Sequence, residues 1–94
     1  MSGEAAVVAR DSVPIGRLIR SVRHERGLTQ YQLADELVLA SGNESLGRGE
    51  VSRWERGKRV PGPYWQRHLS RVLELPPDEL RAAARTAKQL RWRQ

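Results

Sequence analysis

Arginine is the residue type in this sequence best suited to carry chemistry. The chain has 94 residues, with 17 Lys and Arg against 11 Asp and Glu, which leaves a formal net charge of +6. Its lysines are Lys58 and Lys88, so the remaining cationic side chains are guanidinium groups. A guanidinium can donate paired hydrogen bonds to a phosphate or to the edge of a guanine. The excess favours a polyanionic partner, although charge alone is weak evidence for one.

Basic residues are most concentrated in residues 48–59, "RGEVSRWERGKR". A helix turns by about 100° per residue, so a helix through this stretch would have two distinct sides. The inward side would hold Val51, Trp54 and Glu55, and the outward side Gly49, Ser52, Arg53 and Arg56. We expect the outward side to face the major groove of DNA, with Arg53 as the first candidate for reading guanine O6 and N7. Trp54 is expected in the core rather than stacked on a base.

Other chemistries lack the residues that they need. The chain has no cysteine, which excludes disulfides, thiolate nucleophiles and cysteine-bound zinc. His24 and His68 have no partners at metal-ligand spacing, and neither a phosphate-binding glycine loop nor a catalytic triad is evident. We therefore expect no enzyme activity, cofactor, metal or small-molecule site.

Residues 1–12, "MSGEAAVVARDS", have neither the basic start of a signal peptide nor a long apolar run. Their small and polar composition predicts a flexible N-terminal segment, with one domain over residues 13–94. We expect a cytoplasmic protein, associated with the nucleoid and not with a membrane.

The rest of the chain reads as five helices without a strand signal. Ile15, Leu18, Ile19 and Val22 have helical spacing, and Gly27 should end that first helix. Thr29 and Gln32 form a capping box that starts the second helix. Its expected core positions are Leu33, Ala34, Leu37 and Val38.

The last three helices have start signals of their own. Gly47 and Glu50 repeat the spacing of a capping box before a third helix, from about residue 48 to 56, which Gly57 should end. Gly62 and Pro63 start a fourth helix. Its expected inward residues are Trp65, Leu69, Val72 and Leu73. The fifth begins after "LPP", and its apolar stripe is Leu80, Ala83, Ala84, Ala87 and Leu90. We predict a compact, all-α fold of five helices.

Two short capped helices in succession, the second ending at a basic glycine corner, are typical of a helix-turn-helix. The chain contains, in this order, the motifs "RGLTQ", "VSRWERGKR" and "PDEL". From about Ile15 to Leu80 it resembles the family of phage lambda repressor and Cro, which includes xenobiotic-response-type regulators. The resemblance implies a sequence-specific transcriptional regulator of double-stranded DNA, and we expect a repressor. It also implies a base-reading position at Arg48, a phosphate contact at Gln30 and an ion pair between Arg23 and Glu55.

The expected DNA contacts fall into two groups. The base-reading residues are Arg48, Gly49, Ser52 and Arg53, and the phosphate-binding residues are Gln30, Arg56, Lys58 and Arg59. A homodimer is expected as well, since the stripe of Leu80, Ala84, Ala87 and Leu90 could pack against its twin or else cover the core of its own domain. Residues 41–47 make the turn longer than the usual three or four residues, which could alter how the third helix enters the groove.

Several alternatives remain open at this level. Gly49 could permit close approach to DNA or be a tolerated weak helix former. Glu55 could form a surface pair with Arg59 instead of a pair with Arg23. The domain as a whole could be a protein-interaction module or an antitoxin whose main partner is another protein, although such a module has no need of clustered arginines at one corner.

Overall fold

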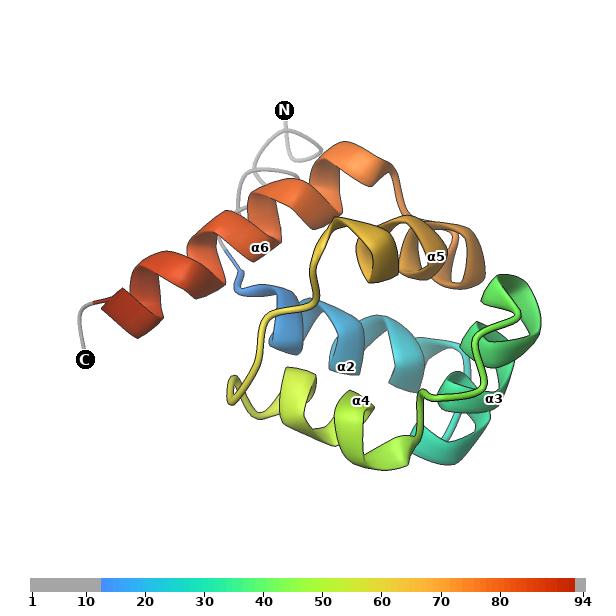
Figure 1. Ribbon diagram of the computed structural model, residues 1–94. Helices are drawn as coiled ribbons and strands as arrows, with labels where there is room; N and C mark the ends of the chain where they lie inside the picture. The colour runs from blue at the N-terminus through green and yellow to red at the C-terminus, as the bar shows by residue number, and fades with distance from the viewer. Residues whose placement is uncertain (1–12, 93–94) are drawn as a thin grey trace.

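The computed structural model describes residues 13–92, with side chains as far as Arg91, and it consists of helices packed around one core (Figure 1). The helices are α2 (Ile15–Glu25), α3 (Gln30–Ser41), α4 (Arg48–Glu55), α5 (Pro63–Leu73) and α6 (Pro77–Trp92). This order confirms the predicted all-α fold of five helices, with no strand in the described part of the chain. The expectation of a flexible segment at residues 1–12 lies outside the described residues.

Local chemistry accounts for the start of α3 and the turn before it. Gly27 adopts a left-handed φ of 70°, which ends the preceding helix. The Thr29 side chain then accepts a hydrogen bond from the Gln32 amide at 3.0 Å, and the Gln32 side chain accepts one from the Thr29 amide at 2.8 Å. The predicted capping box is therefore present, and it fixes where α3 begins.

The start of α4 differs from its prediction. Gly47 is the N-cap residue, but the expected capping-box contact of Glu50 is not the one that forms. The Glu50 carboxylate instead accepts a hydrogen bond from Arg53 and lies near Arg59. Glycine has no side chain to complete the reciprocal bond, and two nearby guanidinium groups attract the carboxylate more strongly than one backbone amide. The helix ends at Glu55, and Gly57, just beyond it, has the left-handed φ of 74° expected of a residue that stops a helix.

The inward face of α5 is rotated slightly from the predicted one. Leu69 and Leu73 are fully buried, but Trp65 and Val72 are only half-buried and pack at the edge of the core. The third inward position belongs to Gln66, which is 8% exposed. Its amide nitrogen donates a 2.8 Å hydrogen bond to the carbonyl of Pro61, so burial does not leave this donor unsatisfied.

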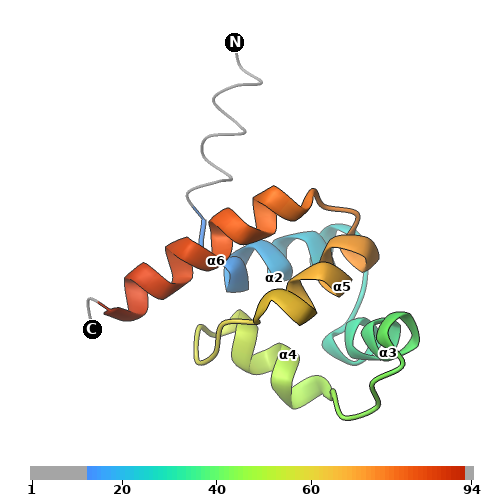
Figure 2. The same ribbon diagram turned by 45° about the horizontal axis from the view of Figure 1, so that its top comes forward.

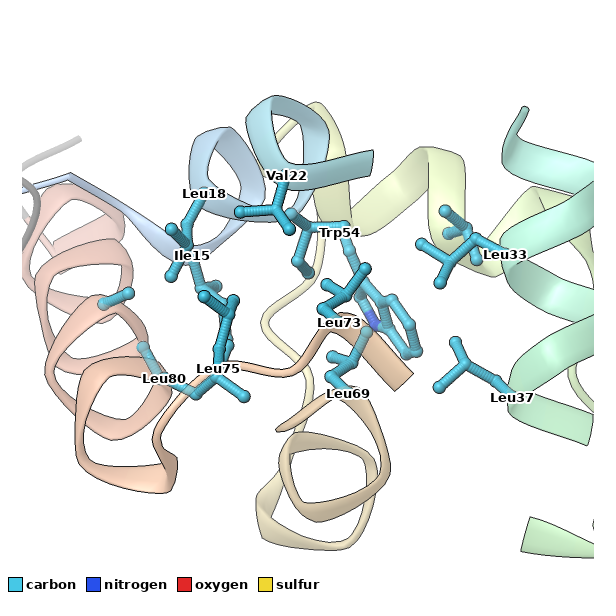
Figure 3. Packing of buried hydrophobic residues seen from close by; sticks show 14 of the residues in the cluster. Ile15, Leu18, Val22, Leu33, Leu37, Trp54, Leu69, Leu73, Leu75 and Leu80 are labelled. Atoms are coloured by element: carbon cyan, nitrogen blue, oxygen red, sulfur yellow. The ribbon is translucent and has the colours of Figure 1, made fainter. Parts of the chain in front are cut away.

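Trp54 of α4 lies at the centre of the core. Figure 3 shows its ring between Leu33 and Leu37 of α3 on one side and Leu69 and Leu73 of α5 on the other. The Trp54 residue is 1% exposed, which confirms that it is a core residue. Because the largest core side chain comes from α4, packing around it fixes which side of this short helix is left for solvent.

Most of the apolar stripe of α6 covers the domain's own core. Leu80, Ala83, Ala84 and Ala87 are buried against the other helices, whereas Leu90 is 44% exposed. Of the two alternatives for this stripe, Leu80, Ala84 and Ala87 follow the second, because they cover the core of their own domain. The end of α6 extends beyond the other helices (Figures 1 and 2). Within the described residues, none of the helices has the length and apolar character required to cross a membrane.

Candidate nucleic-acid interface

The outward side of α4 is basic and exposed. Val51 and Trp54 are 0% and 1% exposed, while Arg48, Gly49, Arg53 and Arg56 face solvent and Ser52 is half-buried. The helix therefore separates its core residues from the predicted base-reading residues, as its periodicity required. Helices α3 and α4 lie side by side (Figures 1 and 2), so the N-terminal part of α3 borders the same surface.

The side chain of Arg53 is hydrogen-bonded to an acidic residue of the same helix. Its Nη1 donates a 3.2 Å hydrogen bond to Oε1 of Glu50, one turn earlier on α4. The other oxygen of Glu50, Oε2, lies 3.6 Å from Nε of Arg59, which follows the helix. One carboxylate thus connects a predicted base-reading residue with a predicted phosphate-binding residue. The acidic residue in the basic stretch restrains two of its guanidinium groups.

Arg48, the first residue of α4, has a different neighbour. Its guanidinium carbon lies 5.2 Å from the centre of the Tyr31 ring, a distance typical of a cation–π contact. Tyr31 is the second residue of α3 and is 65% exposed. The sequence reasoning did not single out Tyr31, because only the packing of α3 beside α4 brings the two side chains together.

A hydrogen-bond network next to this surface joins α2, α4 and α3 through Arg23, Glu55 and Gln30. Arg23 donates to the Glu55 carboxylate from Nε at 2.6 Å and from Nη2 at 2.9 Å, and its Nη1 donates to the carbonyl of Leu28. The expected contact between α2 and α4 is therefore present, and the alternative pair of Glu55 with Arg59 is not the one that forms. The hydrogen bonds from Arg23 to Glu55 raise the pKa of the Arg23 guanidinium above its ordinary value.

Gln30, a predicted phosphate-binding residue, is the third member of this network. Its Nε2 donates a 3.0 Å hydrogen bond to Oε1 of Glu55. Gln30 is the first residue of α3, directly after the Thr29 N-cap. The contact ties the start of α3 to the end of α4, and it restrains the position of the Gln30 side chain.

The basic corner, residues 56–59, follows the end of α4. Arg56, Lys58 and Arg59 are all exposed, and the left-handed Gly57 turns the chain between them. Nη1 of Arg91, near the end of α6, donates a 2.7 Å hydrogen bond to the carbonyl of Lys58. Arg91 was missed from the sequence because it lies far along the chain, and it adds a cation to this corner.

Gly16 is another residue that sequence reasoning missed. This buried residue of α2 faces the last turn of α4, where a Cβ atom would overlap the carbonyl oxygen of Trp54 and lie 3.0 Å from that of Glu55. By contrast, a Cβ on Gly49 would meet only the end of the Arg53 side chain at 3.7 Å. The close crossing of α2 and α4 therefore requires a glycine at position 16. The packing of the fold does not require a glycine at position 49.

Residues 42–47 connect α3 to α4 in an ordered turn. Gly42 ends α3 with a φ of 73°, and the Asn43 side-chain oxygen accepts hydrogen bonds from the amide and hydroxyl of Ser45. Leu46 is 8% exposed and belongs to the core. Internal hydrogen bonds and one buried leucine thus hold the long turn against the domain.

Comparison with known proteins identifies the family. A family model described as a helix-turn-helix domain matches residues 14–84, which include all of α2 to α5 and the start of α6. The chain matched no curated protein and no solved structure. The family match covers well over half of the chain, and it contains both α3 and α4, the helices that form the basic surface. The protein belongs to the helix-turn-helix domain family, and this membership implies that it binds DNA.

Proposed function

We propose that this protein is a sequence-specific regulator of transcription of the lambda repressor and Cro type, with α4 as its recognition helix in the major groove of double-stranded DNA. The observation that carries the proposal is the two-sidedness of α4. Trp54 and Val51 bury one side in the core, and the opposite side presents Arg48 and Arg53 to solvent beside the start of α3. A short helix that is anchored on one side and basic on the other suits insertion into a groove.

The predicted contact residues divide into two roles. Arg48, Gly49, Ser52 and Arg53 lie along the outward side of α4, where they would meet base edges. Arg56, Lys58 and Arg59 lie at or beyond its end, and Gln30 lies at the start of α3. These four would contact the phosphate backbone, which fixes the position of a protein on DNA without reading its sequence.

We propose repression as the direction of regulation. A domain bound in the major groove over a promoter excludes polymerase by occupancy alone, which requires only the DNA-binding surface. The protein acts in this account by binding and not by catalysis. A homodimer on DNA completes the proposal, and the exposed Leu90 at the protruding end of α6 is the residue that supports it.

The salt dependence of DNA binding tests this function. If the basic corner and α3 contact phosphates, log K for duplex DNA should fall with log salt by about 0.9 per phosphate neutralised. Fluorescence anisotropy of a labelled duplex, measured over a series of salt concentrations, gives this slope. A flat slope, or no binding at low salt, would contradict the proposal and favour a module whose main partner is another protein, such as an antitoxin.

A further inference from the structure

Tyr31 is a large aromatic residue that contributes little to the core. It is 65% exposed, whereas the core aromatic Trp54 is 1% exposed. Burial therefore does not explain why an aromatic ring stands at the second position of α3. Its described contact is with the Arg48 guanidinium, whose central carbon lies 5.2 Å from the centre of the ring.

The two arginines on the outward side of α4 are restrained in different ways. Arg53 donates a hydrogen bond to Glu50, which occupies one of its donors. For Arg48, the described part of the chain provides no ion pair or side-chain hydrogen bond, and the Tyr31 ring is the group that restrains it. An unrestrained arginine loses much rotamer freedom when it binds, so a restraint in the free protein favours binding.

An aromatic ring is well suited to this task. A guanidinium has five N–H donors in its plane, and contact with the face of a ring leaves these donors available. A carboxylate in the same place would compete with guanine for them. The Tyr31 ring can therefore restrict the conformations of the Arg48 side chain, while the N–H donors of the guanidinium remain available to a base.

We propose that Tyr31 is a positioning residue for base recognition, which acts through Arg48 and makes specificity at one base pair depend on a residue of α3. The inference rests on the proposed function, since it assigns to Tyr31 a part in the reading of DNA by α4. It requires the ring of Tyr31 but not its hydroxyl group. Under this inference, sequence preference depends on the contact between α3 and α4 and not on α4 alone.

Selection from a library of random-sequence duplexes tests the inference. The base preferences of the wild type are compared with those of Arg48→Ala, Tyr31→Leu and Tyr31→Phe, with Leu39→Ala as the control. Leu39 is also on α3 and is 84% exposed, so its removal changes an exposed apolar side chain away from Arg48. Thermal unfolding of each variant verifies that the fold is retained.

Arg48→Ala should abolish the preference at one base pair. Tyr31→Leu should weaken the preference at the same base pair about two- to fivefold, as expected for the loss of an exposed cation–π contact. Tyr31→Phe and Leu39→Ala should keep the wild-type preference. If Tyr31→Leu keeps it too, or changes a different base pair, the inference is wrong while the proposed function stands. A wild-type protein without any sequence preference would overturn both.

A second measurement needs no DNA. Protons above an aromatic face are shifted upfield in NMR spectra, so the Cδ protons of Arg48 should be shifted upfield in the wild type and in Tyr31→Phe. The shift should disappear in Tyr31→Leu. Unshifted Arg48 protons in the wild-type protein would show that the ring does not restrain this side chain, and would overturn the inference whatever the protein binds.

Discussion

At the scale of single residues, Glu55 has the most demanding environment. Its side chain is 3% exposed, and its carboxylate accepts two hydrogen bonds from Arg23 and one from Gln30. Removal of a carboxylate from water is costly, and only charged partners with good geometry offset that cost. Glu55 therefore lies in a basic stretch because it anchors α4 to α2 and α3, and its buried carboxylate is not itself proposed to meet DNA.

Glu55→Ala should lower the free energy of unfolding by about 3 kcal/mol, because it leaves the Arg23 guanidinium buried without its partner. Glu50→Ala is the matched control on the same helix, since the contacts of Glu50 involve exposed arginines and should be worth about 0–1 kcal/mol. Urea unfolding measures both. A loss below about 1 kcal/mol for Glu55→Ala would mean that the ion pair adds little to the fold.

At the scale of helices, the close crossing of α2 and α4 positions the proposed recognition helix. Gly16 allows this crossing because its missing side chain makes room for the carbonyl groups of Trp54 and Glu55. Gly49 also occupies the second position of a helix, but it faces open space apart from the Arg53 side chain. A comparison of variants at Gly16 and Gly49 can therefore distinguish a glycine required by helix packing from one required by DNA binding.

Gly16→Ala should destabilise the protein by about 1–3 kcal/mol, since a new methyl group overlaps backbone that cannot easily move. Gly49→Ala should stabilise it by up to about 1 kcal/mol, because alanine favours a helix more than glycine does. Thermal or urea unfolding gives both values. A Gly16→Ala protein as stable as the wild type would show that α2 and α4 can separate without cost.

Helix boundaries were predictable where short-range chemistry decides them. The capping box of Thr29 and Gln32, the glycines that end α2 and α4, and the start of α5 all depend on residues within one turn. Gly16 was missed because the backbone that it faces belongs to α4, which is distant in the chain. Gln66 was missed because the apolar pattern does not predict a polar residue at an inward position, even though its partner, the carbonyl of Pro61, is close in the chain. The predicted capping-box contact of Glu50 was wrong because Arg53 and Arg59 compete for its carboxylate, and the spacing of the motif alone does not show this.

The candidate site was predictable in outline but not in its contacts. The periodicity of α4 separates its buried side from its basic side, so the sequence alone indicated which arginines face outward. It did not indicate that Tyr31 meets Arg48 or that Arg91 joins the basic corner, because both depend on how helices pack. The stripe of α6 was ambiguous for a further reason: the same apolar pattern is expected whether a helix covers its own core or a partner.

At the scale of the whole molecule, one copy can read only a short stretch of DNA. Helix α4 has 8 residues, which corresponds to a length of about 12 Å, or the rise of three to four base pairs. So short a contact offers limited specificity, and helix-turn-helix proteins extend it by binding as dimers to two half-sites. The protruding end of α6, with Leu90 exposed, is the surface that we propose for that contact.

We predict a two-fold dimer on DNA whose half-sites are centred about 34 Å apart. Leu90→Arg should weaken dimer formation because it places like charges at the contact, while Leu39→Arg, an equally drastic change on α3, should not. Sedimentation of the complexes with a duplex that carries two half-sites measures the number of chains bound. One chain per duplex, together with a single unrepeated site, would contradict the dimer.

The central claim is that α4 reads base sequence while the residues beyond it hold the backbone, and one comparison tests it most directly. Arg53→Ala and Lys58→Ala are each measured on the preferred duplex and on a panel of single-base changes at several salt concentrations. Arg53→Ala should cost about 1–3 kcal/mol and flatten the preference at one base pair, whereas Lys58→Ala should weaken all duplexes alike and reduce the salt slope by about one. If Arg53→Ala leaves every base preference intact, the outward side of α4 does not read the sequence in the way proposed.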